Sequence, residues 1–345
     1  MAEPLLMNID HNVYLRDDCL VLLDRRHFPQ QILEVVCHNY EEVAKSIEAM
    51  VVQGAGDIAI TAGYGLYLAA RRQESLGIGI EEARKNLLMV KDRLVNTRPT
   101  GFHIKVLLER LLDKVIWQDD NWSGQILNRL TAINKKSDVR SRLTGQWAET
   151  LLQDGDCLLT HCFPGPALLY MLRLALEHGK KIKLITNETR PYLQGARLTA
   201  WSASELGVSV TLISDNMAAY CMSQGMITKV FTAADRIALD GAVANKVGTF
   251  QLAIAAQYHQ LPFYILGYGG PDKKCLRGQD IPIEQRNPKE ILFFNGTKIS
   301  GEKVEGFYPA FDITPPHLLT GIITDRGIFS PGDFYTYWSL PNPIV

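Results

Sequence analysis

Residues that can exchange protons follow short apolar runs in the second half of the chain. Cys162 ends the run Cys157-Leu-Leu-Thr-His-Cys162, Glu188-Thr-Arg190 follows the run Ile182-Lys-Leu-Ile-Thr186, and Asp235 follows the run Lys229-Val-Phe-Thr232. Such runs have the length and composition of buried strands. Ligands of parallel sheets bind at the carboxyl ends of the strands. We therefore expect the chemistry of this protein at these strand ends.

The surroundings of Cys162 favour a reactive thiol. The next residues are Phe-Pro-Gly-Pro-Ala, and Pro166 can occupy the first turn of a helix that continues to Glu177. The positive end of a helix lowers the pKa of a nearby thiol and favours the thiolate. The alternative is an inert, half-buried thiol. Since His161 points to the other side of the strand, we expect it to be a hydrogen-bonded core residue and not a partner of Cys162.

Asp235 has the surroundings of a proton donor. It lies in the segment Thr-Ala-Ala-Asp-Arg-Ile-Ala, where the alanines and Ile237 offer little solvation. Apolar surroundings raise the pKa of a carboxyl group, which can then donate a proton near neutral pH. The alternatives are an ion pair with Arg236 or a helix cap.

Polar and basic residues elsewhere in the chain could hold a phosphate group. Arg98 lies in Asn-Thr-Arg-Pro-Thr-Gly and Gln194 in Leu-Gln-Gly-Ala-Arg, while Asn245 and Lys246 precede a helix expected to begin near Gly248. Arginine side chains and helix N-termini are common phosphate ligands. Each residue taken alone has the alternative of a surface charge or a cap.

Sequence signatures of cofactor and metal sites are missing. Residues 54–59 fit the loose dinucleotide pattern G-x-G-x-x-A, but residues 46–52 before them have a helical pattern where a strand is required. The chain has neither a P-loop nor an H-E-x-x-H motif, and its six cysteines form no C-x-x-C pair. We expect no metal, no cofactor and reduced thiols.

The apolar pattern predicts an α/β protein with two domains. Residues 39–130 have mainly helical periodicity, with one stripe at Val43, Ile47, Val51 and Val52 and another at Leu87, Leu88, Val90 and Leu94, and residues 12–36 alternate like a small antiparallel sheet. Apolar runs at 157–162, 182–186, 208–213, 229–232 and 263–266 alternate with helical segments and predict a parallel sheet. We place a helical N-terminal domain at residues 1–140 and a catalytic domain at residues 141–345.

The charge balance excludes some classes of partner. The 36 basic and 37 acidic residues give a net charge of -1, which produces no long-range field for nucleic acid or an anionic membrane. No apolar run reaches transmembrane length, and the first residues do not resemble a signal peptide. We expect a cytoplasmic protein that binds neither nucleic acid nor membrane.

Long segments of the chain resemble the methylthioribose-1-phosphate isomerase family. The relatives of this family include ribose-1,5-bisphosphate isomerases and regulatory subunits of an initiation-factor exchange complex. The similarity spans nearly the whole chain. It is densest in six segments: 159–162 (Leu-Thr-His-Cys), 188–201 (Glu-Thr-Arg-Pro-Tyr-Leu-Gln-Gly-Ala-Arg-Leu-Thr-Ala-Trp), 234–237 (Ala-Asp-Arg-Ile), 243–249 (Val-Ala-Asn-Lys-Val-Gly-Thr), 281–284 (Ile-Pro-Ile-Glu) and 309–315 (Pro-Ala-Phe-Asp-Ile-Thr-Pro).

The resemblance implies roles for individual residues. Cys162 and Asp235 align with the catalytic cysteine and aspartate of the family. The positions that align with its substrate-binding residues are Gln53, Gly54, Ala55, Arg98, Gln194, Asn245 and Lys246. The family also implies a helical domain beside a Rossmann-like domain, a homodimer, and a sugar phosphate as the small-molecule partner. The implied reaction converts a 5-substituted or 5-deoxy ribose 1-phosphate to the ribulose 1-phosphate without a cofactor.

Two loops depart from the family. Catalytic members typically carry Arg-Gly-Ala-Pro-Ala-Ile-Gly where this chain has Gln53-Gly-Ala-Gly-Asp-Ile-Ala59, and Phe163-Pro164 replaces Asn-Ala. Losing an arginine and gaining Asp57 is expected to weaken phosphate binding, because a charge-assisted hydrogen bond is lost and a carboxylate repels the phosphate. We expect these changes to alter the substrate while the chemistry is kept.

Two other functions compete with the one that the resemblance implies. The first is an isomerase specific for 5-deoxyribose 1-phosphate or ribose 1,5-bisphosphate, which the changed loop favours. The second is a non-catalytic regulatory subunit like the initiation-factor relatives. Those relatives do not keep the paired cysteine and aspartate, whereas this chain has Cys162 and Asp235 in matching contexts. Catalysis is therefore the favoured reading.

Overall fold

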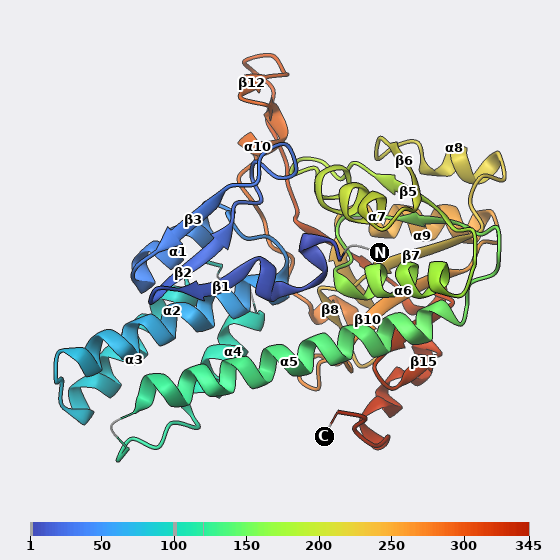
Figure 1. Cartoon of the computed structure of the whole chain (residues 1–345). Helices are drawn as coiled ribbons and strands as arrows, with labels where there is room; N and C mark the ends of the chain where they lie inside the picture. Colours follow the sequence, from blue (N-terminus) through green and yellow to red (C-terminus); the bar gives the residue numbers. More distant parts are fainter. Residues whose placement is uncertain (1–2, 99–101, 120, 345) are drawn as a thin grey trace. The chain divides into compact units, whose positions relative to one another are not determined.

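The computed structural model describes residues 3–98, 102–119 and 121–344, and these form two compact units. One unit comprises residues 8–138, and the other comprises residues 1–7 together with residues 139–345. Helix α5 (Trp122–Glu149) begins in the first unit and ends in the second (Figure 1). Residues 1–7 belong to the second unit, and not to the N-terminal domain where the sequence placed them, because Met7 is buried in the core of the second unit.

The first unit consists of helices and a small antiparallel sheet, as predicted. Strands β1 (Val13–Arg16), β2 (Cys19–Leu23) and β3 (Glu34–Cys37) pair in sequence order. Helices α1 (Tyr40–Glu48), α2 (Ala55–Ser75), α3 (Ile80–Val95) and α4 (Phe102–Leu112) follow. The element directly before the G-x-G-x-x-A segment is helix α1 and not a strand. The dinucleotide pattern was correctly rejected.

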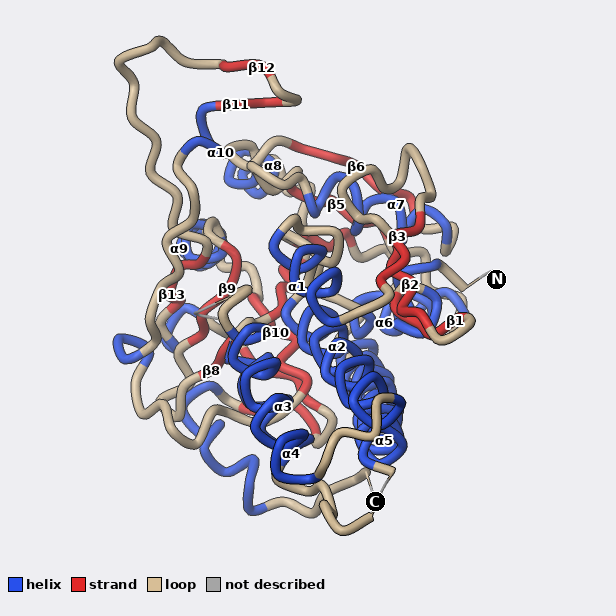
Figure 2. The backbone as a smooth tube through the Cα atoms, turned by 90° about the vertical axis from the view of Figure 1, so that its left-hand side faces the viewer, coloured by secondary structure: helices blue, strands red, loops and turns tan. Residues whose placement is uncertain are grey.

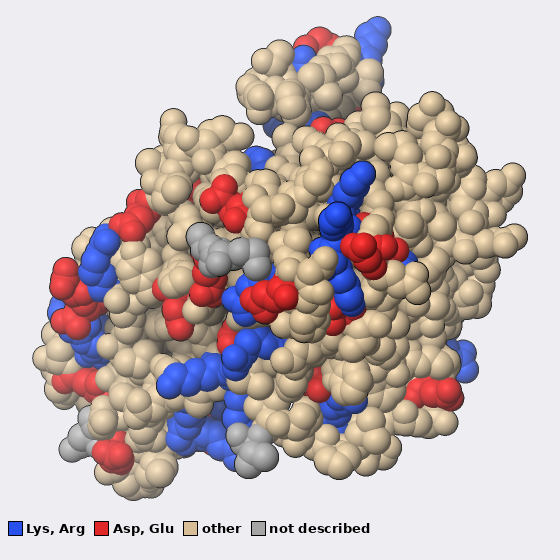
Figure 3. Space-filling view, turned by 45° about the vertical axis from the view of Figure 1, so that its right-hand side comes forward, with Lys and Arg blue, Asp and Glu red and all other residues tan. Residues whose placement is uncertain are grey.

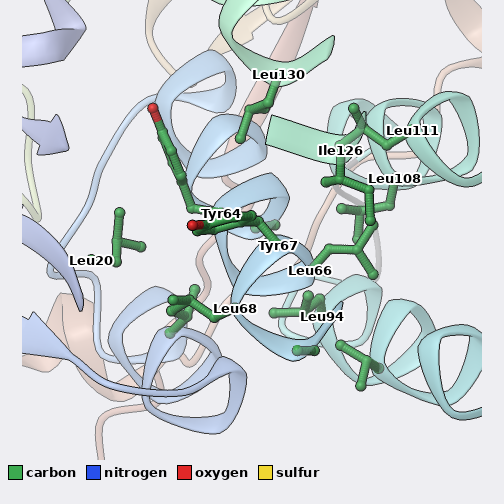
Figure 4. Close-up of a cluster of buried hydrophobic side chains, with 14 of the residues drawn as sticks. Leu20, Tyr64, Leu66, Tyr67, Leu68, Leu94, Leu108, Leu111, Ile126 and Leu130 are labelled. Carbon is green, nitrogen blue, oxygen red and sulfur yellow. The ribbon is translucent and has the colours of Figure 1, made fainter. Parts of the chain in front are cut away.

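Helix α2 is the centre of the helical unit's core. Figure 4 shows side chains from β2, α3, α4 and α5 gathered around Tyr64, Leu66, Tyr67 and Leu68 of this helix. The predicted stripe in α3 is buried at Leu87, Val90 and Leu94, but Leu88 is 44% exposed. Leu88 is adjacent to Leu87 in the helix and therefore turned by about 100° from it, toward solvent.

The second unit is built on a seven-stranded sheet with the order β15-β14-β10-β7-β4-β5-β6. All neighbouring strands are parallel except β14 and β15, which are antiparallel. The strands are β4 (Cys157–Thr160), β5 (Lys183–Asn187), β6 (Ser209–Ile213), β7 (Lys229–Ala233), β10 (Phe263–Tyr268), β14 (Gly321–Thr324) and β15 (Gly327–Phe329). The predicted Rossmann-like α/β class is confirmed, although β14 and β15 were not predicted.

Helices cover both faces of this sheet. Leu158 and Leu184 pack with α6 (Pro166–Glu177) and α7 (Ala200–Glu205), while the next residue of each strand packs with α8 (Ala218–Ser223) and α9 (Thr249–Tyr258). The strand order reverses direction between β4 and β7. In such sheets this reversal opens a crevice at the carboxyl ends of the two strands. Cys162 follows β4 and Asp235 follows β7, so both residues lie at the crevice.

A smaller sheet beside the crevice was not predicted. Strands β8 (Arg236–Ile237), β9 (Val243–Lys246) and β13 (Phe311–Thr314) pair antiparallel, with β9 in the middle. Helix α10 (Lys289–Leu292) leads to the hairpin of β11 (Phe293–Phe294) and β12 (Thr297–Lys298), which projects on a long loop (Figure 2). The small sheet matters for the site because β9 carries Asn245 and Lys246.

Charged side chains of both signs lie on the surface of the protein. On the face shown in Figure 3, acidic and basic side chains are interspersed and form no large patch of one sign. Within the described ranges, no helix combines the length and apolar composition needed to cross a bilayer. All six cysteines are described, and none forms a disulfide.

Replacing Gly145 with alanine should destabilise the second unit, although alanine favours helix formation. A Cβ atom at Gly145 in α5 would lie 2.6 Å from Tyr170 Cβ and 2.9 Å from Ala167 O in α6. The helices would have to separate, at a cost of about 1–3 kcal/mol for overpacking. Urea unfolding measures the change. The control is Gly56→Ala in α2, where nothing lies within 4 Å; equal stability changes in the two variants would contradict the close packing.

Candidate active site

The backbone of Cys162 is held in a left-handed conformation. Its φ is 62°, which is uncommon for a residue with a side chain and costs free energy unless neighbours hold it. Cys162 N donates to Thr189 Oγ1 at 2.9 Å, and Thr199 Oγ1 donates to Cys162 O at 2.5 Å. The two threonines therefore fix the direction in which the thiol leaves the backbone.

Tyr268 holds the loop that joins Cys162 to helix α6. Its hydroxyl donates to Pro164 O and accepts a hydrogen bond from Ala167 N at 3.2 Å. Gly165 has a φ of 87°, and a Cβ atom there would lie 2.5 Å from the tyrosine oxygen. As predicted, Pro166 is the first residue of the helix. The loop and the helix N-terminus are thus positioned from strand β10.

His161 is a buried core residue, as expected. Its Nε2 lies 2.9 Å from Val247 O, and its Nδ1 lies 3.2 Å from the amide nitrogen of Asn187. An amide nitrogen can only donate, so Nδ1 accepts and Nε2 carries the hydrogen. Burial lowers the pKa of His161. The imidazole is therefore neutral, and its two ring nitrogens bind Val247 and Asn187.

The Cys162 thiol has a high pKa, so the prediction of a lowered value is wrong. Burial raises the pKa of Cys162 to about 11, and the Asp235 charge adds to the increase. Lys246, Arg286 and the backbone N–H of Phe163 act in the opposite direction but do not outweigh burial. The helix N-terminus suggested a thiolate, but removal of the thiol from water dominates. The thiol is therefore protonated at neutral pH.

Asp235 lies in the same group of charges as Cys162. It follows β7 by two residues, and its backbone N donates to Ala244 O at 2.9 Å. This bond ties Asp235 to strand β9. Its charge raises the pKa of both Cys162 and Lys246. Two residues that are 73 positions apart in the chain are thereby brought together, as the strand-end argument predicted.

Lys246 adds a buried amine to this group. Its Nζ donates to Tyr308 Oη at 3.3 Å and lies 5.5 Å from the centres of the Tyr308 and Phe311 rings. Burial, together with the charge of Arg286, lowers the pKa of Lys246 to about 8. Its neighbour Asn245 is buried and donates from Nδ2 to Thr249 Oγ1 at 3.0 Å, in the first turn of α9.

Sequence reasoning missed Arg286 and the aromatic residues around it. The guanidinium of Arg286 forms an ion pair with Glu284 at 2.9 Å and lies 5.4 Å from the Tyr192 ring and 5.9 Å from the Tyr308 ring. Its positive charge acts on both Cys162 and Lys246. None of these residues follows an apolar run. The available signal was that Arg286 and Tyr308 adjoin two of the segments in which the family resemblance is densest.

Gln194 stands at the start of an unusual helical turn. It precedes a π-helix, η3 (Gly195–Thr199), whose last residue is the threonine that binds Cys162 O. Gln194 is buried, and its Oε1 has no hydrogen-bond partner within the described part of the chain. Single π-turns occur frequently at functional sites. A buried amide oxygen without a partner is also expected where a ligand supplies the missing donor.

The other predicted substrate residues belong to the helical unit. Arg98 Nη2 donates to Ile47 O at 3.1 Å, and Gln53 Nε2 donates to Met50 O at 3.3 Å, so both side chains meet at the turn after α1. Gly54 and Ala55 follow as the cap and first residue of α2. Thus Cys162, Asp235, Gln194, Asn245 and Lys246 lie in one unit, and Gln53, Gly54, Ala55 and Arg98 in the other.

Sequence comparison finds isomerases among the relatives. A family model described as the initiation factor 2 subunit family matches residues 51–331. The methylthioribose-1-phosphate isomerase of Fervidobacterium nodosum is 40% identical over 325 residues, which cover 91% of this chain and 93% of the relative. The enzyme of the same name from Carboxydothermus hydrogenoformans is 38% identical, and the match covers 92% of this chain and 95% of the relative.

Comparison with solved structures finds two kinds of protein that have the same sequence identity to this chain. The 5-methylthioribose 1-phosphate isomerase of Pyrococcus horikoshii matches with a TM-score of 0.84 and 34% identity over 95% of this chain and 94% of its own. Translation initiation factor eIF-2B, subunit delta, from A. fulgidus matches with a TM-score of 0.80 and 34% identity, covering 93% and 96%. The chain therefore belongs to the initiation factor 2 subunit family, in the branch of the methylthioribose-1-phosphate isomerases.

Proposed function

We propose that this protein is a sugar-phosphate aldose-ketose isomerase that converts methylthioribose 1-phosphate, or a close 5-substituted or 5-deoxy analogue, to the ribulose 1-phosphate. The observation that carries the proposal is the shared electrostatic environment of Cys162, Asp235 and Lys246 at the switch point of the sheet. Isomerases of this name match more than nine-tenths of the chain. This makes an isomerase a better reading than a regulatory subunit, and neither a 5-deoxyribose nor a bisphosphate specialist is favoured.

The proposal gives the binding groups separate tasks. The Lys246 ammonium attracts the phosphate, and the Gln194 amide oxygen accepts a hydrogen bond from a sugar hydroxyl. Asn245, Arg98 and the backbone of residues 53–55 are the further proposed substrate contacts. The homodimeric state and the cytoplasmic location stay predictions. Sedimentation of the purified protein tests the homodimeric state.

Ring opening is the first chemical problem of the reaction. The phosphate on the anomeric oxygen prevents the sugar from opening spontaneously to a free aldehyde. In the proposed mechanism, Asp235 in its neutral form protonates the ring oxygen while its bond to C1 breaks. General-acid assistance of this kind contributes about a hundredfold to ten-thousandfold.

The high thiol pKa indicates how the acid and the base are generated together. Since sulfur holds a proton at neutral pH, Cys162 becomes a base only after losing it, and the Asp235 carboxylate is a nearby acceptor. This transfer leaves a thiolate and a neutral carboxyl group. The thiolate then removes the hydrogen at C2 as a proton, which gives an enol phosphate, and returns a proton to C1. The proton of the C2 hydroxyl passes to the thiolate as the ketone forms, which restores the thiol and the Asp235 carboxylate. The rival route is a direct hydride shift from C2 to C1, with Cys162 stabilising charge.

Replacing Cys162 with serine or Asp235 with asparagine should abolish turnover with little effect on folding. Each change removes one member of the proton-transfer pair while the size of the side chain is nearly kept. Steady-state rates of ketose formation and the thermal midpoint measure the two effects. Cys157→Ser is the control, because that cysteine begins β4 outside the site. Near-normal turnover in either site variant would rule out this assignment.

The value of kcat/KM should fall as the pH rises above about 8. The Lys246 ammonium is present below its pKa of about 8 and is lost above it, so the attraction for the phosphate declines. Since kcat/KM reports groups of the free enzyme, the decline should approach tenfold per pH unit. In Lys246→Arg, which stays charged, the decline should disappear. A wild-type profile that stays flat to about pH 9.5 would contradict this role of Lys246.

Turnover in deuterated water separates the two routes. The enol route places solvent deuterium at C1 of the ketose, because the proton removed from C2 exchanges on Cys162 before it returns. A hydride shift places none there. We expect deuterium at C1, measured by proton magnetic resonance of the product; its complete absence after full conversion would favour the hydride route instead.

A further inference from the structure

The loop before α2 combines a feature that attracts anions with one that repels them. Gly54 caps this 21-residue helix with a φ of 99° and no side-chain cap, so backbone N–H groups of the first turn are available to a ligand. Asp57 lies in the same first turn, and its side chain is 27% exposed. An unpaired carboxylate there would already occupy the positive end of the helix and would repel a phosphate group.

Arg25 supplies a positive charge directly at this loop. Its guanidinium donates to the backbone oxygen of Gln53 and to the Asp57 carboxylate, with a side-chain exposure of 1%. A Cβ atom on Gly54 would lie 3.9 Å from Arg25 Nη1. The backbone of Arg25 is also attached to this region, because its N–H donates to Val51 O at 2.9 Å. One buried side chain therefore contacts the residues on both sides of Gly54.

The ion pair between Arg25 and Asp57 changes the net charge that the sequence suggested for this loop. Gln53 is neutral where catalytic relatives typically carry an arginine, and Asp57 alone would leave the loop negative. With Arg25 buried against Asp57, the two charges cancel and the N–H groups of the first turn keep their attraction for an anion. Arg25 is 32 positions before Asp57, so the compensation was not visible in the local sequence.

We propose that Arg25 is a positioning residue for phosphate binding, which acts by neutralising Asp57 and not by contacting the substrate. The inference rests on the proposed function in one respect, namely that the phosphorylated substrate contacts the backbone of residues 53–55. Its consequence is a specific coupling: loss of Arg25 is harmful only while Asp57 is charged. A residue that merely fastened the loop through Gln53 O would show no such dependence on Asp57.

A double-mutant cycle on Arg25 and Asp57 tests the coupling. Arg25→Gln should raise KM about tenfold or more with kcat little changed, since a repelling carboxylate is exposed to the phosphate. Asp57→Asn alone should leave KM near the parent value, because Arg25 already cancels that carboxylate and does not contact the substrate. The double variant Arg25→Gln/Asp57→Asn should return KM to within about threefold of the parent value. Arg25→Lys, which keeps the charge and loses the fork geometry, should also stay near the parent.

Stability is measured separately from binding in each variant. Removal of one partner of a buried ion pair destabilises a protein, so Arg25→Gln alone can fail to fold. In that case the double variant and Arg25→Lys decide the question, because neither leaves an unpaired carboxylate. Arg93→Gln is the matched control: Arg93 pairs with Glu41 at 2.8 Å and Glu48 at 2.7 Å in the same unit. It should lower the thermal midpoint and leave KM unchanged.

The outcomes also separate this inference from the proposed function. An unchanged KM in folded Arg25→Gln, or a raised KM that Asp57→Asn does not restore, overturns the inference while the parent enzyme remains an isomerase. If the parent isomerises no pentose 1-phosphate, the proposed function fails, and the thermal shift caused by inorganic phosphate replaces KM as the readout. A shift that is lost in Arg25→Gln and restored in the double variant then supports the inference alone; an equal shift in all variants overturns it.

Discussion

The anchorage of the Cys162 backbone is the constraint on which the rest of the site depends. A left-handed residue at the end of a buried strand is held only because Thr189 and Thr199 bind its N–H and C=O groups. Thr189 is itself left-handed, with a φ of 64°, and the Asp215 carboxylate accepts from its backbone N at 2.8 Å. The strain is thus distributed over a short network of hydrogen bonds. The thiol on this backbone is affected by the charges of Asp235, which follows β7, and of Lys246, which ends β9.

Burial shifts the two ionisable groups beside Asp235 in opposite directions. It raises the pKa of the Cys162 thiol and lowers the pKa of the Lys246 ammonium, because in both cases the charged form loses hydration. The surroundings of Cys162 and Lys246 therefore disfavour a thiolate and also weaken the hold on the ammonium proton. An anionic substrate would stabilise the ammonium. In the proposed mechanism, substrate binding and proton transfer are coupled because both depend on the same desolvated group of side chains.

The sequence predicted the strands that are continuous apolar runs, because such a run by itself indicates a buried strand. Strands β4, β5 and β7 are continuous apolar runs because parallel strands are buried on both faces, and the residues that follow them were found for this reason. Strands β8, β9 and β13 are short and carry charged residues, so their pattern did not stand out. Arg286 reaches the site from a loop, and Arg25 meets Asp57 from a distant strand end; neither contact has a local signal. The thiol pKa was misjudged because sequence shows a helix N-terminus but not the extent of desolvation.

The central claim is that Cys162 is a partly buried, protonated thiol whose pKa is raised by desolvation and further by the Asp235 charge. The rate of its alkylation by a small neutral reagent, measured against pH with the modified residue identified by mass spectrometry, tests this claim most directly. The account predicts a midpoint above the ordinary thiol value of 9, approaching about 11, and a lower midpoint in Asp235→Asn. A midpoint at or below 9 in the parent, or one that Asp235→Asn leaves unchanged, would contradict it.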